Sequence, residues 1–329
     1  MVTPVTETTT PAATPRPHDV PDLTVAHAIT PFHLGHVPVR GRLITLGPLA
    51  GAILSRHDEL PEPVRLLGGQ ALALVAAMAT ALKFKGSFSL QVKGDGPVSL
   101  FLADCTDTGE LRFTARMAED YTLPLPEDAS GLLGKGYMAF TVDQGPDTDR
   151  YQGIVGLEGP TLADMAEHYF QTSEQHDCAI HLFSRHTESG RQAGALVLER
   201  LPDSTPIAGN DDHRPADATI QDLWETACTF GQTLTAEELF NPQLSPGALI
   251  NRLFGTLDVE LAPARPLSFG CRCSRARLQG VLERFSGEDL DHMAQDGVIS
   301  MECHFCNTAF TFTRESLPDG QKNGDAGAP

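Results

Sequence analysis

The sequence has little positive charge and no apolar run of membrane length, and both absences narrow what the chain can do. Its 24 Lys and Arg residues stand against 43 Asp and Glu, giving a formal net charge of −19. Phosphate-rich partners require a basic surface, so nucleic acid is not an expected partner. The uncharged run 66–82 contains Gln70 and Thr80 and is short for a membrane span. We therefore expect a buried core helix there and no membrane partner.

The first 22 residues lack the marks of a secretory signal. They are rich in Thr and Pro and have neither a basic first part nor an apolar second part. We expect residues 1–22 to be a disordered extension and residues 315–329 to be a disordered tail. The chain is then expected to be cytoplasmic, where thiols stay reduced and clustered cysteines indicate a metal site or a redox device.

A complete catalytic motif is also missing from the sequence. Residues 131–136, Gly-Leu-Leu-Gly-Lys-Gly, are similar to a phosphate-binding loop. However, Ala129 stands where the first glycine of that motif belongs, and Gly136 stands where a Ser or Thr would bind Mg²⁺. We expect a turn there, leading into a strand at Tyr137. No Ser/His/Asp or paired-carboxylate arrangement stands out, so the sequence predicts that the protein is not an enzyme.

Residues 23–206 have the pattern of a single α/β core, and 329 residues leave room for further parts. Successive candidate strands alternate with a period of two and are separated by Gly, Pro and Asp. In the second of them, Val98, Leu100 and Leu102 are expected to share the buried face. Short turns between strands favour an α+β fold with a mostly antiparallel sheet packed with helices. The candidate strands are 88–92, 98–102, 111–116, 137–142, 150–157, 180–183 and 195–201, with a helix over 162–170.

Residues 207–265 differ from the core in predicting three short helices after a polar loop. The second helix begins with a capping box formed by Thr235 and Glu238, and the third has Ser245 as its N-cap and Pro246 at its first position. Helices this short are marginal by themselves and depend on what they pack against. We therefore expect this segment to be a metastable helical linker.

Four of the seven cysteines lie in the segment 266–314, as Cys271-Arg-Cys273 and Cys303-His-Phe-Cys306. Four thiolates in two close pairs are what one tetrahedral Zn²⁺ needs, so we predict a small zinc-binding domain in this segment. A purely structural site is one interpretation. The other is a redox-responsive site, because the Cys-x-Cys pair is unusual for structural zinc and its two thiols could meet when oxidised.

The other three cysteines and the arginines near the four-cysteine cluster are expected to have supporting roles. Cys105, Cys178 and Cys228 have no cysteine close in sequence, so we expect them to be small buried apolar side chains. Three arginines between 272 and 277 would offset part of the negative charge of a zinc ion with four thiolates. They would also keep those thiolates reactive towards oxidants.

A series of short motifs occurs in an order that resembles the redox-regulated 33 kDa chaperonin family of bacterial heat-shock proteins. The similarity extends from about residue 37 to residue 312 and includes both cysteine pairs. The motifs are Ala-Leu-Lys-Phe (81–84), Gly-Asp-Gly-Pro (94–97), Gly-Lys-Gly-Tyr (134–137), Arg-Tyr-Gln-Gly-Ile-Val-Gly-Leu (150–157), Tyr-Phe (169–170), Ser-Glu-Gln (173–175), Phe-Gly-Cys-Arg-Cys-Ser-Arg (269–275) and Glu-Cys-His-Phe-Cys (302–306).

This resemblance implies an ATP-independent holdase that is controlled by oxidation. In the reduced, inactive form, Cys271, Cys273, Cys303 and Cys306 would hold one Zn²⁺. Oxidation under unfolding conditions would form the Cys271–Cys273 and Cys303–Cys306 disulfides and release zinc. The zinc domain and linker would then unfold and expose apolar surface that binds unfolding client proteins, with a homodimer as the active form.

Two other functions compete with this one. The first is a constitutive, zinc-stabilised protein-binding module whose four-cysteine site is purely structural. The second is a thiol–disulfide oxidoreductase. This function is less favoured, because the segment 303–306 is not expected to lie between a strand and a helix as the cysteine pair of a thioredoxin-like site does.

Overall fold

The computed structural model describes residues 20–35, 37–80, 84–145, 148–201 and 217–318. The chain divides into two compact units, one formed by residues 21–270 and one that contains residues 271–318. Most of the expected N-terminal extension and C-terminal tail, residues 1–19 and 319–329, lie outside the described residues. Residues 315–318, expected to belong to the tail, are instead ordered, because Leu317 is buried in the core of the second unit. The same holds for the polar loop that was expected at the start of the linker.

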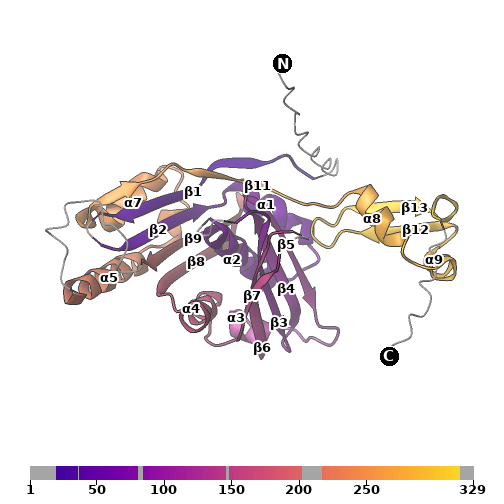
Figure 1. Ribbon diagram of the computed structural model, residues 1–329, viewed down its shortest axis with the longest axis horizontal. Helices are drawn as coiled ribbons and strands as arrows, with labels where there is room; N and C mark the ends of the chain where they lie inside the picture. Colours follow the sequence, from indigo (N-terminus) through magenta and orange to yellow (C-terminus); the bar gives the residue numbers. More distant parts are fainter. Residues whose placement is uncertain (1–19, 36, 81–83, 146–147, 202–216, 319–329) are drawn as a thin grey trace, which may run out of the picture. The chain divides into compact units, whose positions relative to one another are not determined.

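The first unit is built on one large sheet (Figure 1). Its strands are β1 (Thr24–Leu34), β2 (Val39–Thr45), β3 (Ser87–Gly94), β4 (Val98–Thr106), β5 (Glu110–Met117), β6 (Gly136–Asp143), β7 (Tyr151–Gly156), β8 (Cys178–Thr187), β9 (Gly190–Arg200), β10 (Val259–Leu261) and β11 (Arg265–Phe269). Its helices are α1 (Pro48–Leu54), η1 (Ser55–His57), α2 (Glu62–Ala79), α3 (Ala129–Leu133), α4 (Leu162–Ser173), α5 (Asp217–Gln232), α6 (Ala236–Leu239), α7 (Pro246–Phe254) and η3 (Gly255–Leu257).

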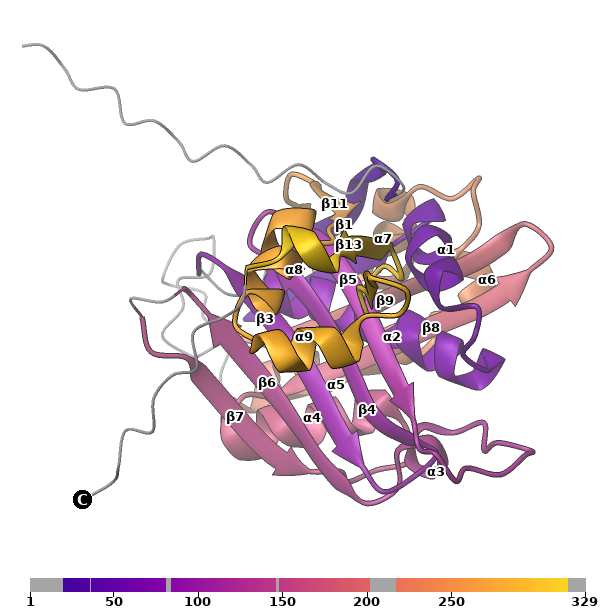
Figure 2. The ribbon, with the colours of Figure 1, turned by 90° about the vertical axis from the view of Figure 1, so that its right-hand side faces the viewer.

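The sheet runs in the order β7-β6-β3-β4-β5-β11-β1-β2-β9-β8, with β10 beside β1. Neighbouring strands are antiparallel except β5 and β11, which are parallel, so the expected α+β fold with a mostly antiparallel sheet is confirmed. Figure 2 shows β7, β6, β3, β4 and β5 side by side. α2 packs against strands of both halves of the sheet, and α4 packs against β7 and β8, the two ends of the strand order.

The apolar run after Pro63 forms the central helix, as the sequence predicts. α2 is buried from Ala71 through Ala79, and Thr80 closes its end by donating its hydroxyl to the carbonyls of Ala76 and Ala77. A helix that is apolar on all sides is stable only inside a core. α2 therefore holds the two halves of the sheet together.

The glycine motifs around residues 94 and 136 are explained by two backbones in close contact. In the pairing of β3 with β6, Gly94 lies opposite Gly136. A Cβ on Gly94 would come within 1.8 Å of the Leu133 carbonyl oxygen, and one on Gly136 within 2.0 Å of the Lys93 carbonyl oxygen. The side chain of Asp95 accepts a hydrogen bond from the Lys135 N–H at 2.6 Å. Residues 131–133 form the end of α3 rather than part of the expected turn, which is confined to Gly134 and Lys135. The strand expected at Tyr137 is present as β6, and the glycines before it serve packing.

The buried face of β4 differs from the one expected. The register between β4 and β5 shifts between Val98 and Leu100. Such a bulge turns the following residues over. Val98 is buried as predicted, but the core side of the strand is then carried by Phe101 and Ala103, while Leu100 and Leu102 are only half-buried.

The three helices predicted in the segment 207–265 are present, and they cover one face of the sheet. The capping box of Thr235 and Glu238 starts α6, and Ser245 caps α7. These helices and the turn between α5 and α6 contribute to one core cluster, which contains Trp224, Ala227, Leu234, Leu239, Leu249, Ile250 and Phe254. From β1, β2 and β9 and the turn between β1 and β2, the cluster takes Phe32, Leu34, Val37, Val39, Leu43, Leu196 and Leu198.

The second unit is small and has a minimal core. It consists of α8 (Arg275–Leu282), α9 (Gly287–Met293), the hairpin of β12 (Val298–Glu302) and β13 (Ala309–Thr313), and η4 (Arg314–Ser316). Its buried core is formed by Leu282, Leu290, Ile299, Phe312 and Leu317. Units of this size with so few buried apolar side chains usually depend on a metal or on disulfides.

Candidate metal centre

The four predicted ligands come from two loops of the second unit. Cys271 and Cys273 lie between β11 and α8, and the side chain of Ser274 caps α8 directly after them. Cys303 and Cys306 lie in the turn between β12 and β13. The structure therefore brings together residues that are 32 and 33 positions apart in the chain.

The turn that carries the second pair is tightly hydrogen-bonded. The carbonyl of Cys303 accepts from the N–H of Cys306 at 3.2 Å and from that of Asn307 at 2.7 Å. Asn307 has a φ of 50°, a left-handed conformation that asparagine tolerates better than most residues. The N–H of Cys303 donates to the Thr308 carbonyl at 3.1 Å. This backbone geometry fixes both sulfurs on one side of the turn.

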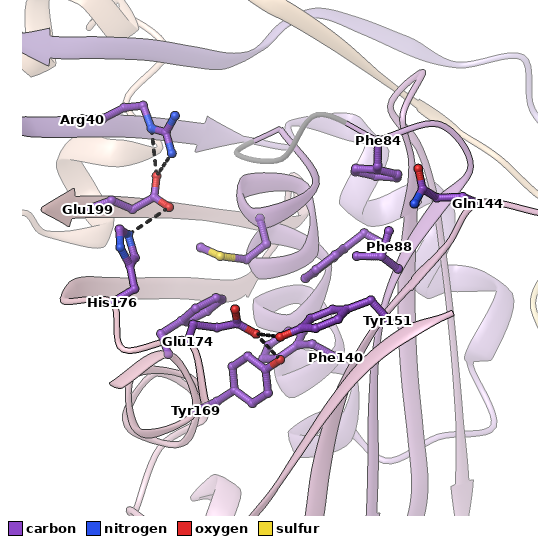
Figure 3. A pocket seen from close by; sticks show the side chains of 13 residues that line it. Arg40, Phe84, Phe88, Phe140, Gln144, Tyr151, Tyr169, Glu174, His176 and Glu199 are labelled. Carbon is purple, nitrogen blue, oxygen red and sulfur yellow. Dashed lines mark hydrogen bonds and ion pairs between the residues drawn. The ribbon is translucent and has the colours of Figure 1, made fainter. Parts of the chain in front are cut away.

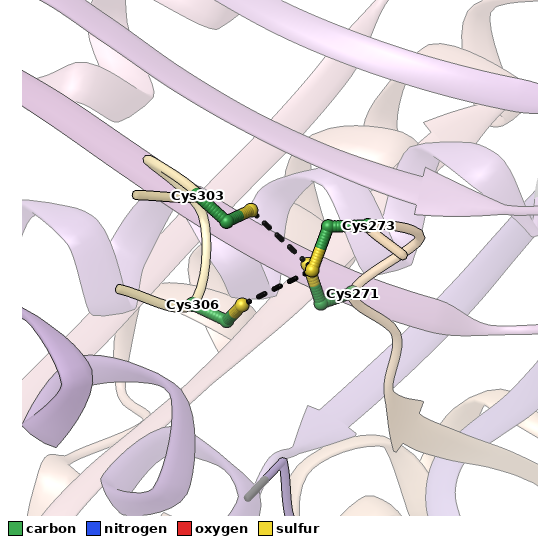
Figure 4. Close-up of side chains that lie close together, drawn as sticks. All are labelled: Cys271, Cys273, Cys303 and Cys306. Carbon is green, nitrogen blue, oxygen red and sulfur yellow. Dashed lines mark hydrogen bonds between the residues drawn. The ribbon is translucent and has the colours of Figure 1, made fainter. Parts of the chain in front are cut away.

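The four sulfurs form a compact cluster (Figure 4). The Sγ atom of Cys271 lies 3.4 Å from that of Cys273 and 3.5 Å from that of Cys303, and the Sγ atoms of Cys273 and Cys306 are 3.5 Å apart. All four Sγ atoms lie within 4.8 Å of one another. A regular tetrahedron with Zn–S bonds of about 2.3 Å has S···S edges of about 3.8 Å. The cluster therefore fits one tetrahedral metal ion.

Crowding of these thiols makes their acidities unequal. Burial raises the pKa of Cys273 to about 12. The hydrogen bond between the Cys271 and Cys303 side chains is the chief cause of two opposite shifts: it raises the pKa of Cys271 and lowers the pKa of Cys303. A doubly charged cation is the group that would stabilise all four as thiolates.

The arginines between 272 and 277 have contacts of their own within the unit. The guanidinium of Arg275 donates to the Thr311 carbonyl at 2.5 Å and lies 4.6 Å from the centre of the Phe312 ring. Arg277 donates to the Arg272 carbonyl at 2.6 Å. These contacts join the first cysteine loop to the hairpin and to the start of α8, so two of the three arginines stabilise the fold around the cluster.

The other three cysteines lie outside the cluster. Cys105 is fully buried in β4, as expected, whereas Cys178 in β8 and Cys228 in α5 are half-buried. Burial raises the pKa of Cys178 and raises that of Cys228 to about 11. All three are therefore weakly reactive thiols.

A pocket that the sequence did not indicate lies in the first unit (Figure 3). It has a volume of about 420 Å³. Several family motifs converge on it, since Phe84, Tyr151, Tyr169, Phe170 and Glu174 all belong to the short motifs found in the sequence. Its lining is completed by Arg40, Met78, Phe88, Phe140, Val142, Gln144, His176 and Glu199. The motifs are far apart in the sequence, and only the fold shows that these residues meet.

Fold and site together define the class of this protein: an α+β protein with a C-terminal unit whose four cysteines suit a thiolate-bound metal. A family model described as "Hsp33 protein" matches residues 28–313. The chain belongs to the Hsp33 family of chaperones. Among the described residues, no helix combines the length and the apolar character needed to cross a membrane.

Comparison with individual proteins gives the same family. The 33 kDa chaperonin of Caulobacter vibrioides is 36% identical over 292 residues, which cover 86% of this chain and 93% of that protein. The 33 kDa chaperonin of Shewanella woodyi is 36% identical over 275 residues, covering 83% and 88%. The crystal structure of the Thermotoga maritima 33 kDa chaperonin, also titled heat shock protein 33 homolog, has a TM-score of 0.71 and 20% identity, covering 88% of this chain and 96% of that chain.

The family resemblance inferred from the motifs is therefore confirmed. Membership supports a chaperone role, and with it the binding of unfolded client proteins, and members of this family are chaperones rather than enzymes. The four-cysteine cluster is present and could hold a metal ion.

Proposed function

We propose that the protein is a cytoplasmic, ATP-independent holdase that is activated by oxidation of Cys271, Cys273, Cys303 and Cys306. The observation that carries the proposal is the cluster of four free thiols in a unit with a minimal core. As a bound ion, Zn²⁺ would supply folding free energy to this unit, because small metal domains fold only with their metal. The reduced protein would hold one Zn²⁺ with these four residues.

Oxidation would remove the ligands. Each disulfide forms from two thiols with loss of two electrons and two protons, and hydrogen peroxide accepts them to give two waters. The family resemblance assigns the pairs as Cys271–Cys273 and Cys303–Cys306. Sulfur atoms 3.4–3.5 Å apart occur both within and between these pairs. The assignment is therefore part of the proposal. Disulfide formation would release the metal and unfold the second unit.

The same proposal divides the chain into a chaperone core at 23–206, a metastable linker at 207–265 and a zinc redox-switch domain at 266–314. Support for the linker's role comes from its packing, because its helices cover an apolar face of β1, β2 and β9. Unfolding of the linker would expose that face. Large exposed apolar surfaces bind non-native proteins. The activated form would be a homodimer, its partners would be unfolding clients, and neither nucleic acid nor membrane would be bound.

The experiment that tests this function follows three quantities in one sample. The reduced protein is treated with peroxide at mild heat, and zinc content, free thiols and suppression of client aggregation are measured over time. We expect loss of zinc, loss of four thiols and gain of suppression to occur together. A constitutive module with a structural site predicts suppression before oxidation and damage after it. A Cys228→Ser variant, which lacks a thiol outside the cluster, should respond like the unaltered protein.

A further inference from the structure

The floor of the pocket in the first unit is aromatic and already assembled. Phe140 of β6 is stacked on Phe88 of β3, with ring centres 5.4 Å apart. It also contacts Tyr169 and Phe170 of α4, at 4.6 Å and 5.5 Å between ring centres. Rings held by several neighbours do not need to rearrange to receive a ligand. An apolar side chain of a ligand can therefore enter with little cost in ordering.

One end of the pocket carries a carboxylate that no cation balances in the described part of the chain. Glu174, at the end of α4, accepts hydrogen bonds from the hydroxyls of Tyr151 at 2.8 Å and Tyr169 at 2.9 Å (Figure 3). Both donors are neutral, and Glu174 is exposed. The negative charge at this end is thus held in place and open to a positively charged group.

The second carboxylate that lines the pocket, that of Glu199, already has positively charged partners. The carboxylate of Glu199 is bound by Arg42 and lies 3.1 Å from Arg40 and 3.5 Å from the ring of His176. The two arginines more than match its charge. A cationic ligand group is therefore directed to Glu174 rather than to Glu199.

The strand next to Glu174 has one edge on which no other described strand pairs. β7 stands at the end of the strand order, and among the described residues β6 is the strand paired with it. The exposed fractions of Tyr151 and Ile154 are 55% and 56%, large for apolar side chains. A free edge with exposed apolar residues accepts an extended peptide, whose backbone hydrogen-bonds to the strand while alternate side chains enter pockets.

We propose that β7 and the adjoining pocket form a preformed site for an extended peptide segment that carries an apolar side chain two residues away from a lysine or arginine, so that both side chains point to the same face of the peptide. The apolar side chain enters the aromatic pocket, the basic one approaches Glu174, and the backbone extends the sheet beyond β7. This inference goes beyond the proposed function, since it names a ligand class for a surface that is already formed in the reduced protein. The site needs no loss of zinc, and a net charge of −19 favours basic segments over acidic ones.

The test uses the full chain in its reduced, zinc-loaded form and a fluorescein-labelled nonapeptide with a central Phe, a Lys two residues after it and Thr at the other positions. Binding is measured by fluorescence anisotropy. We expect Phe→Ala in the peptide to abolish binding, and Lys→Glu to weaken it more than Lys→Gln does. Two further peptides are N-methylated at every second amide, one in each phase. We expect one phase to lose binding, because only one set of N–H groups faces β7.

Protein variants locate the site. Glu174→Gln keeps the hydrogen-bond acceptor and removes the charge, and we expect it to weaken the lysine peptide by about fivefold, as for an exposed ion pair. The same variant should not change the affinity for the Lys→Gln peptide. The matched control is Glu188→Gln, which removes the same charge from the exposed turn between β8 and β9. Amides of β7 should exchange hydrogen more slowly with saturating peptide.

Several results would overturn the proposal. These are equal effects of the two protein variants, binding that ignores N-methylation in both phases, or unchanged exchange at β7. Self-association of the protein through β7 that excludes the peptide would also overturn it. Because no oxidant is used, failure here leaves the redox switch untouched. If the protein binds the peptide but does not suppress client aggregation more strongly after oxidation, the proposed function is wrong and the peptide site is not.

Discussion

The ring of Phe254, at the end of α7, is stacked on the ring of Phe32 in β1, with centres 5.4 Å apart and planes 27° apart. Both side chains are fully buried. Opposite them, a Cβ on Gly41 of β2 would come within 2.0 Å of the Phe32 ring, so a glycine is required there. This contact joins the helical segment to the sheet. Because Phe32 is covered by this segment, its exposure would report detachment of the helices.

The first prediction concerns the Phe254→Ala variant. Truncating a buried Phe costs about 3–5 kcal/mol. The lost free energy is that of packing α7 against the sheet, so we expect α7 to detach more often in the reduced variant. Hydrogen exchange in β1 and α7 should rise, and the reduced variant should suppress client aggregation without oxidant.

The control for this prediction is Leu123→Ala, which removes a side chain that is 74% exposed. It should change neither hydrogen exchange nor aggregation of the client. If Phe254→Ala lowered overall stability while the reduced protein remained inactive, the face under α7 would not be the client-binding surface.

The second prediction concerns metal removal under reducing conditions. Chelation of zinc leaves a unit whose core consists of five buried apolar side chains. We expect residues 271–318 to lose hydrogen-exchange protection, while α2 and β3 keep theirs, because structural zinc supplies folding free energy. A Cys306→Ser variant should bind far less than one equivalent of zinc. Retained protection after chelation would show that the unit folds without metal.

The sequence contained the ligands and the linker helices, but some of the fold depends on long-range contacts. Cysteine spacing and the caps at Thr235 and Ser245 are local signals, so they could be predicted. β11 could not, because a strand that ends at Phe269 and pairs with both β1 and β5 has no signal in its own five residues. The pocket could not be predicted from the sequence either, because Tyr151 and Glu174 are distant in sequence and are brought into contact only by the fold.

The third prediction concerns Leu317, near the end of the described chain. Its side chain is buried with Leu282 and Phe312, and its carbonyl accepts from Arg314 at 3.2 Å. A buried Leu→Ala change costs about 2–5 kcal/mol. In a unit whose folding is coupled to metal, that loss should appear as weaker zinc binding and as zinc release at lower peroxide concentration. Met293→Ala, at a half-exposed position of the same unit, should leave both measurements unchanged.

The fourth prediction concerns the ion pair of Glu199 with Arg42. Burial alone would raise the pKa of Glu199, but the His176 ring 3.5 Å away and the charges of Arg42 and Arg40 lower it from the ordinary 4.5 to about 2. A lowered carboxylate pKa stabilises the fold above pH 4.5, and this contribution is lost as the pH falls from 4.5 through 2. Glu199→Gln leaves Arg42, which is 2% exposed, without its counter-charge.

We therefore expect Glu199→Gln to lower the free energy of unfolding by about 3–5 kcal/mol at pH 7, as for a broken buried ion pair. Between pH 4.5 and 2, the unaltered protein should lose stability faster than the variant, so that their curves converge. Urea unfolding followed by circular dichroism at several pH values measures both. The double variant Arg42→Met, Glu199→Leu should recover most of the stability at pH 7, because apolar pairs often replace buried ion pairs without loss. Curves for Glu199→Gln and the unaltered protein that stay parallel down to pH 2 would mean that Glu199 is not the group whose charge is stabilised.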